Sequence, residues 1–127
     1  MNRTRLWILH MAAGVVLFLV LGMHMAIMHL GGVSHLFAPY AGTADSIQNS
    51  LFRDRMPFFT VSYVLLLGVA LFHGLYGFRT ILFELTLKRA AERAITVVLL
   101  VVGLGLFALG TWAAVAAHGM ALAGVKG

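Results

Sequence analysis

Three long apolar stretches limit what this chain of 127 residues can fold into. They lie at about residues 6–30, 57–80 and 94–117, and each can cross ~30 Å of hydrocarbon as an α-helix that rises ~1.5 Å per residue. With 61% hydrophobic and only 10% charged residues, the chain has more apolar surface than a soluble domain of this size can bury. We therefore expect an all-α integral membrane protein, with residues 1–127 forming a single domain of three transmembrane helices.

Basic residues at the ends of these stretches predict the orientation of the chain. Three crossings place the N-terminus and the connection at about residues 81–93 on one side, and the connection at residues 31–56 on the other. The side of the N-terminus carries six basic residues: Arg3, Arg5, Arg79, Lys88, Arg89 and Arg93. The opposite side carries three: Arg53, Arg55 and Lys126. The positive-inside rule therefore predicts a multi-pass protein of the cell inner (cytoplasmic) membrane with a cytoplasmic N-terminus.

The lack of cysteine limits the redox chemistry that the chain can support. It excludes disulfides, iron–sulfur clusters held by thiolates and zinc sites of the cysteine type, so redox chemistry must use histidine. The net charge of +5 comes from the ends of the apolar stretches, where membrane proteins keep their basic residues, so nucleic acid is not an expected partner. The sequence shows no catalytic nucleophile, metal triad or nucleotide-binding loop, so we do not expect the chain to be a catalyst on its own.

A histidine inside the second apolar stretch is the first candidate for a functional residue. His73 lies about two turns from the end of this helix, and Gly77 follows one turn later on the same face. An ionisable side chain in hydrocarbon is costly and usually faces a partner or a cofactor. Because Gly77 has no side chain, it leaves room for a broad, flat group against the helix. Haem fits that description.

A second histidine, His24, lies at a different depth. His73 is roughly 10 Å from the cytoplasmic end of its span, whereas His24 is roughly 25 Å from the same face. One haem iron cannot easily bind both, so the sequence predicts two haems stacked across the membrane, with His73 and His24 as their metal ligands. The methionines Met23, Met25 and Met28 around His24 suit a cofactor wall, and they suit an ordinary helix interface equally well.

The residues that follow His73 resemble a known family. The pattern His73-x-x-x-Gly77-x-Arg79, with the acidic Glu84 five residues further on, is similar to the second helix of the cytochrome b membrane anchors of succinate dehydrogenase and fumarate reductase. This motif is the more specific part of the resemblance, which covers the first two apolar stretches.

The N-terminal stretch supports the same family. Residues 8–15, in which His10 precedes Gly14 by four positions, are similar to the start of the first anchor helix. His24 falls where two-haem members carry a distal haem ligand. The chain also departs from the family pattern, because Trp7 stands where members often have serine and Met11 where they often have arginine. The quinone contacts of the family are therefore not transferred to these positions.

The resemblance implies a membrane anchor and electron-transfer subunit of a succinate:quinone oxidoreductase. Such a subunit would hold a flavoprotein subunit and an iron–sulfur subunit at the cytoplasmic face and pass their electrons to a quinone, with b haem behind the quinone. His73 would be an axial ligand of the proximal haem. Arg79 would contact a haem propionate or the docking surface, and His10 would lie by the quinone pocket or a propionate. Three helices are too few to enclose two haems, so a second membrane anchor subunit with its own histidines is expected.

Each histidine also has a simpler interpretation. His73 could be a buried residue that is hydrogen-bonded to a neighbouring helix, and His24 could be a hydrated structural residue near the outer interface. His118 ends the third stretch on the same side as His24 and could pair with it within one chain, although we favour a ligand from a second anchor subunit. His29 and His35 suit interfacial or loop positions.

Two other functional classes remain open at this stage. One is a haem b subunit of a different quinone-linked respiratory enzyme, such as a hydrogenase or a formate dehydrogenase, which the soluble partner subunits would identify. The other is a haem-free structural or transport protein with three helices, whose histidines would line a path for protons or metal ions. The absorption spectrum of the reduced protein would separate this last class from the haem proteins.

Overall fold

Four helices make up the computed structural model, which describes residues 3–30, 43, 46–85 and 88–124. Three are long and apolar enough to span a membrane: α1 (Arg3–His29), α4 (Pro57–Phe83) and α5 (Arg89–Ala123). The fourth, α3 (Ile47–Asp54), has only eight residues. The structure thus confirms the expected all-α fold with three candidate transmembrane helices.

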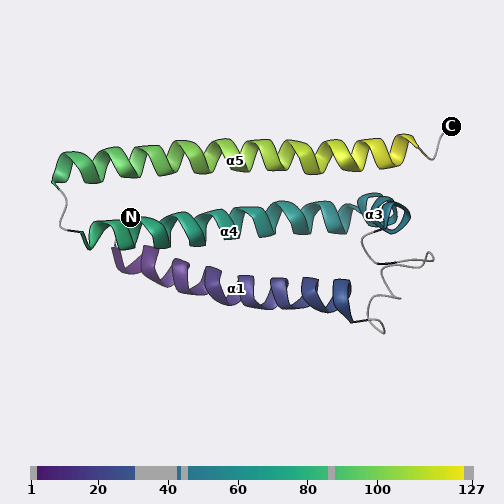
Figure 1. Cartoon of the computed structure of the whole chain (residues 1–127), viewed down its shortest axis with the longest axis horizontal. Helices are drawn as coiled ribbons and strands as arrows, with labels where there is room; N and C mark the ends of the chain where they lie inside the picture. The colour runs from purple at the N-terminus through teal and green to yellow at the C-terminus, as the bar shows by residue number, and fades with distance from the viewer. Residues whose placement is uncertain (1–2, 31–42, 44–45, 86–87, 125–127) are drawn as a thin grey trace.

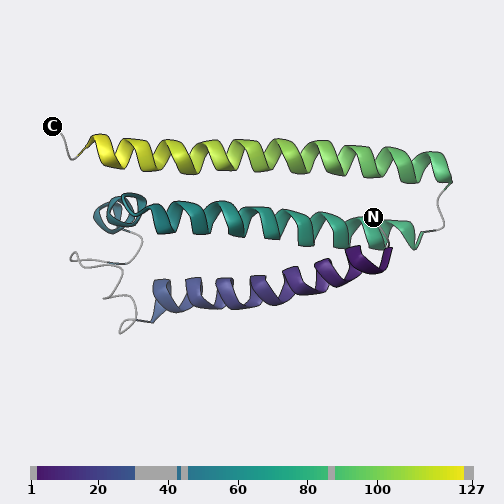
Figure 2. The same cartoon turned by 180° about the vertical axis from the view of Figure 1, so that it is seen from behind.

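The three long helices lie side by side in one row, with α4 between α1 and α5 (Figure 1). The same order is seen from behind in Figure 2. Successive helices run in opposite directions, so the N-terminus lies at the end of the row where α4 finishes and α5 begins, and the C-terminus lies at the other end. Only α4 packs along both of the others. Its two sides are therefore where a site within this chain can form.

The helices extend beyond the apolar stretches that define them in the sequence. α1 begins at Arg3 rather than at about residue 6, and α4 continues past Thr80 to Phe83. α5 has 35 residues and a length of roughly 50 Å, so it projects from the hydrocarbon. Pro57 occupies the first turn of α4, where its missing N–H leaves no hydrogen bond unmade.

The short helix α3 was not expected in the connection at residues 31–56. It begins after Ser46, whose hydroxyl accepts a hydrogen bond from the backbone N–H of Asn49, as an N-cap residue does. The side chain of Asn49 is fully buried and donates to the same hydroxyl and to the carbonyl of Thr43. α3 lies across the end of the row where α4 begins and α5 ends (Figure 1).

Polar contacts fix α3 to the last turns of α5. Arg55, which follows α3 directly, donates from Nε to the carbonyl of Ala121 at 3.2 Å. His118 Nδ1 donates to the carbonyl of Asp54, the last residue of α3. The two contacts use carbonyls at helix ends, where the backbone has no partner within its own helix.

Very little of this chain is buried within its own structure. Among the described residues, the buried apolar side chains are Ala13, Ile27, Phe59 and Ala121. Large apolar residues are instead exposed, such as Phe18 at 77% and Trp112 at 69%. In water this surface would be unstable, but lipid and further membrane subunits can cover it.

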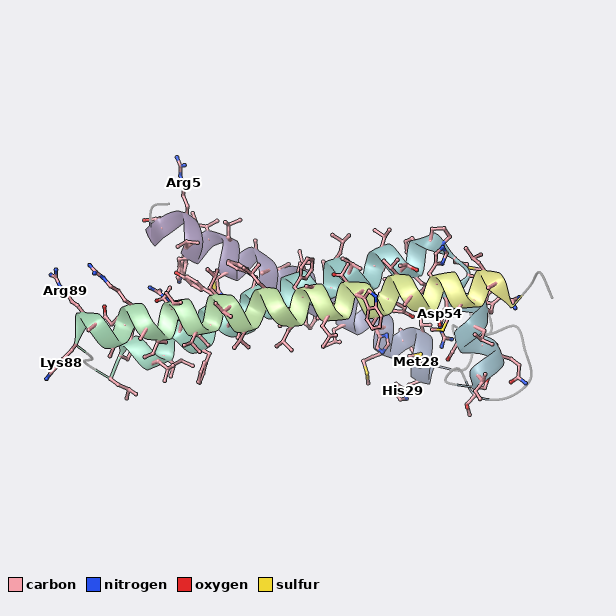
Figure 3. The ribbon with its side chains drawn as sticks, turned by 90° about the horizontal axis from the view of Figure 1, so that it is seen from above. Arg5, Met28, His29, Asp54, Lys88 and Arg89 are labelled. Atoms are coloured by element: carbon pink, nitrogen blue, oxygen red, sulfur yellow. The ribbon has the colours of Figure 1, made fainter. Side chains whose placement is uncertain are left out.

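Charge also separates the two ends of the row. Arg5, Lys88 and Arg89 project at one end, whereas Met28, His29 and Asp54 lie at the other (Figure 3). Arg53 and Arg55 also lie at the second end, in and just after α3, so basic residues are more numerous at the first end without being confined to it. This is the asymmetry that the positive-inside rule uses.

Glycines set how closely α5 approaches α4. A Cβ atom at Gly103 would stand 2.6 Å from Leu75 Cδ1, and one at Gly110 would meet Leu67 Cδ2. At Gly105, in contrast, a Cβ atom would have no neighbour within 4 Å. Gly103 and Gly110 are therefore packing positions, as expected for small residues between transmembrane helices, and Gly105 is not.

We predict that Gly103→Val destabilises the assembled protein by about 1–3 kcal/mol, because the added side chain must displace Leu75 and separate α4 from α5. Gly105→Val is the matched control, since it adds the same side chain two residues away in open space. Thermal unfolding of the purified complex measures both variants. Equal melting temperatures would contradict this account of the α4–α5 contact.

Candidate functional site

Two histidine rings stack between α1 and α4. The centroids of His10 on α1 and His73 on α4 are 4.2 Å apart, and the ring planes differ by only 9°. The ring of Tyr76 is also close to His10, with the two centroids 5.2 Å apart and the planes tilted by 46°. The structure thus brings together two of the histidines that the sequence singled out, although the sequence did not predict that they touch.

Each of these rings lies against a glycine of the opposite helix. A Cβ atom at Gly14 would stand 3.0 Å from Cε1 of His73, and a Cβ atom at Gly77 would stand 3.1 Å from Cε1 of His10. In both helices the glycine follows the histidine by four residues, so two antiparallel His-x-x-x-Gly segments interlock. The space that Gly77 leaves is filled by the ring of His10 from the same chain, rather than being left open for a flat cofactor.

A hydrogen bond defines the protonation of His73. Its Nδ1 lies 3.1 Å from the backbone carbonyl of His10. A carbonyl can only accept, so Nδ1 carries a proton, and in the neutral tautomer with this hydrogen bond Nε2 holds a lone pair. Metal-ligating histidines are commonly held in this way, with one ring nitrogen donating to a carbonyl and the other facing the metal. The hydrogen bond to a neighbouring helix and a ligand role are therefore compatible.

The ring of His10 has an unsatisfied nitrogen. Its Nδ1 is buried and has no hydrogen-bond partner. Buried polar atoms without partners are uncommon in native structures. The backbone carbonyl of His10 thus accepts a hydrogen bond from His73 and its ring stacks on His73, while its own Nδ1 has no hydrogen-bond partner.

A cavity of about 580 Å³ lies next to this stack, between α4 and α5. Tyr76 lines it and also contacts His10, so the cavity and the stack share a wall. Most of the lining is apolar, including Leu100 and Leu104 of α5. The polar side chains Arg79 and Thr96 lie toward the end of the row that carries Lys88 and Arg89. The cavity therefore suits an amphiphile with a long apolar part.

Arg79 is held by contacts within the chain. Its Nε donates to Thr96 Oγ1 at 2.9 Å, and this hydroxyl donates in turn to the carbonyl of Glu92. The guanidinium carbon lies 4.0 Å from the ring centroid of Phe83, a cation–π distance. These contacts join the end of α4 to the start of α5 and place the charge at the edge of the cavity.

His24 lies at the opposite end, beside a smaller pocket of about 170 Å³. We call this the outer pocket. Its lining combines polar and apolar side chains, namely Val20, Met23, His24, Ile27, Met28, Arg53, Phe58, Phe59, Ser62, Tyr63 and Leu66. His24 itself is exposed, so its imidazole is accessible to a ligand or a partner subunit. The sequence interpretation counted Arg53 only as a charge in a loop and missed its place here.

The structure does not bring His118 to His24. α4 lies between the helices that carry them, and His118 Nδ1 is used by the carbonyl of Asp54 (Figure 1). His29 is at the end of α1 (Figure 3), and His35 falls outside the described residues. Within the described ranges no three His, Asp or Glu side chains form a metal-binding group. The candidate ligands are therefore single imidazoles, which is the arrangement that haem iron accepts.

A comparison with protein families identifies the chain. The family model described as succinate dehydrogenase/fumarate reductase transmembrane subunit matches residues 2–110. The chain belongs to this family. The matched residues include all of α1, α3 and α4 and most of α5, so the resemblance that the motifs around His10 and His73 indicated is confirmed. No curated protein and no solved structure matches the chain significantly.

Family membership gives the histidine pair its setting. The protein is a multi-pass membrane subunit of the succinate dehydrogenase/fumarate reductase type. His10 and His73 lie within its first two candidate spanning helices, and their stack is one of the contacts that join these helices.

We predict that Gly14→Val breaks the stack and lowers the stability of this transmembrane subunit in its complex by about 1–3 kcal/mol, because the new side chain overlaps the ring of His73. Gly22→Val is the control on the same helix, since a Cβ atom there has nothing within 4 Å. Thermal unfolding of the complex gives the comparison. If the two variants melt together, the ring of His73 does not lie on Gly14.

Proposed function

We propose that this subunit anchors a succinate:quinone oxidoreductase to the membrane, binds b-type haem through His73 Nε2 and takes part in electron transfer to a quinone. The observation that carries the proposal is the hydrogen bond from His73 Nδ1 to the carbonyl of His10. It leaves Nε2 as a lone-pair donor in the hydrocarbon, where an imidazole without a ligand is costly. Family membership gives this ligand a redox setting.

The other residues of the stack position that ligand. The carbonyl of His10 fixes the tautomer and the angle of the His73 ring, and Gly14 gives the ring room to lie against α1. The stacked ring of His10 limits rotation of His73 about its side-chain bonds. Gly77 in turn allows His10 to approach α4. We assign His10 and Gly77 to the support of the ligand and not to a contact with iron.

The haem would supply one-electron transfer between the iron–sulfur subunit and the quinone. Ligation by two histidines leaves no open position on iron, which suits electron transfer and not oxygen binding. The other imidazole at this level, His10, is stacked against His73 and so cannot ligate the opposite side of the same iron. The second axial ligand would therefore come from a second membrane anchor subunit. The exposed apolar faces of the row give that subunit a surface to cover.

The basic end of the row would face the cytoplasm. Arg5, Lys88 and Arg89 lie at this end (Figure 3), and the flavoprotein and iron–sulfur subunits would dock there. Residues 1–127 would then form one transmembrane domain with its N-terminus inside. His24, at the outer end, would ligate a second b haem. Arg79 would contact a propionate of the inner haem or the docking surface.

The cavity between α4 and α5 is the part of this chain that best suits the quinone. Its apolar lining can hold an isoprenoid chain, and Arg79, Thr96 and Tyr76 offer polar groups to a head group near the cytoplasmic end. Tyr76 also contacts His10, so a quinone there would be one side chain away from the histidine stack.

We predict that His73→Leu removes one b haem from the purified complex and weakens its assembly, because iron loses an axial ligand and haem binding no longer favours subunit association. His29→Leu, at the end of α1, is the control and should keep the full haem content. Haem is measured by the reduced-minus-oxidised spectrum per mole of flavin. Full haem content in the His73→Leu complex would refute the ligand assignment, and a wild-type complex without b-haem absorption bands would favour a haem-free structural subunit.

We predict that Leu104→Trp raises the KM for quinone several-fold while haem content stays normal, because the larger side chain fills the cavity without touching the histidine stack. Leu104 and Leu109 are equally exposed, each at 62%, but Leu109 does not line the cavity. Leu109→Trp is therefore the matched control. Steady-state kinetics with succinate and a soluble quinone measure both, and an unchanged KM in both variants would place the quinone elsewhere.

A further inference from the structure

A buried arginine without a full set of partners lies in the outer pocket. Arg53 is only 5% exposed, although it belongs to the short helix α3 at the end of the row. Its Nη2 donates to Ser50 Oγ at 3.3 Å. Its Nη1 is buried and has no hydrogen-bond partner. No function described above uses this side chain.

The charge of Arg53 makes this unsatisfied nitrogen significant. A guanidinium stays protonated at any physiological pH, so it cannot avoid the cost of burial by becoming neutral. Buried charges in proteins are normally paired, because desolvation of an unpaired ion is strongly unfavourable. Among the described residues, no carboxylate forms a salt bridge with Arg53 or hydrogen-bonds its Nη1. The described residues therefore supply no anion for Arg53, and a carboxylate or phosphate from a ligand or partner would stabilise it.

The neighbours of Arg53 indicate which kind of anion. The same pocket is lined by the imidazole of His24, by the polar side chains of Ser62 and Tyr63, and otherwise by apolar residues. A ligand that contacts all of these groups has a carboxylate for Arg53, an apolar part for the apolar lining and a group that binds the imidazole of His24. A lipid phosphate or a carboxylate of a partner helix could also pair with Arg53, but neither brings a metal ion for the lone pair of the His24 imidazole, as haem does.

The order of the groups along the helices suits a haem. His24 lies five residues before the end of α1, roughly 7 Å deeper than His29. Arg53 lies on α3, which crosses the end of the row (Figure 1). The imidazole is thus on the hydrocarbon side and the cation on the water side. The propionates of a haem in a membrane point toward water in the same way, while the apolar ring stays in the hydrocarbon.

We propose that Arg53 binds a propionate carboxylate of the outer haem, the haem whose iron His24 ligates. The inference rests on the second haem of the proposed function. Nη1 donates a charge-assisted hydrogen bond to the carboxylate, and Ser50 holds the guanidinium in place through Nη2. Arg53 is a positioning residue for the cofactor, and its charge also favours the ferrous over the ferric state, because reduction removes one positive charge from the iron.

The test is a redox titration of both b haems in the purified holo-complex carrying Arg53→Gln. The expected result is a lower midpoint potential and a lower occupancy for one haem, with the other haem unchanged. Arg53→Lys keeps the positive charge but lacks the planar guanidinium with its several N–H donors. It should shift the midpoint potential of the same haem by less. Arg55→Gln is the matched control two residues away, because Arg55 donates to the carbonyl of Ala121 and does not line the outer pocket. Both potentials should remain normal in that variant.

Several results would overturn the inference. Unchanged potentials in assembled Arg53→Gln complex would show that Arg53 does not contact the haem. Unchanged potentials together with weaker binding of the second anchor subunit in the Arg53→Gln complex would assign the anion to a carboxylate of that subunit. Unchanged potentials together with loss of a tightly bound phospholipid from the Arg53→Gln complex would assign it to a lipid phosphate. The variant His24→Leu tests the outer haem itself. If this variant keeps both haems, His24 is not a haem ligand and the inference about Arg53 is wrong as well, whereas the assignment of His73 is unaffected.

Discussion

The contact between α1 and α4 depends on two rings that can lie flat only because each faces a glycine. His10 meets Gly77 and His73 meets Gly14, at distances so short that a Cβ atom at either glycine would push against the ring. The spacing of four residues is the same in both helices, and antiparallel helices with equal spacing bring both pairs into register at once. The two reciprocal contacts fix the position of His73 along α4 relative to α1. The hydrogen bond from Nδ1 to the carbonyl of His10 leaves Nε2 as the nitrogen that a ligand can reach.

The arrangement of the helices explains why such a contact is needed. A row of three helices has little interior, and most large apolar side chains of this subunit remain exposed. In a bilayer, lipid competes equally for these apolar faces, so packing between helices relies on close approach and polar contacts. Glycines allow α4 to approach α1 and α5 closely. The hydrogen bond of Arg79 joins the end of α4 to the start of α5, and that of Arg55 joins the residue after α3 to the end of α5. The remaining faces are left for partner subunits.

Much of the fold was predictable from the sequence, because long apolar stretches and terminal charges report directly on transmembrane helices. The family was also predictable, because the segment after His73 carries a specific motif. The contact between His10 and His73 was not. Periodicity within one helix shows which residues share a face, but not which residues of another helix lie opposite. For the same reason the open space expected at Gly77 is filled by His10.

The arginines at the two ends of the molecule show why charge counting was insufficient for the site. Arg79 and Arg53 both entered the sequence interpretation as basic residues at helix ends, yet their surroundings differ. Arg79 is held by the hydroxyl of Thr96 and the ring of Phe83, so its position needs no ligand. Arg53 is more buried and lacks a partner at Nη1. Two arginines that look alike in a charge count thus differ in the hydrogen bonds that their neighbours provide, and only the structure shows that difference.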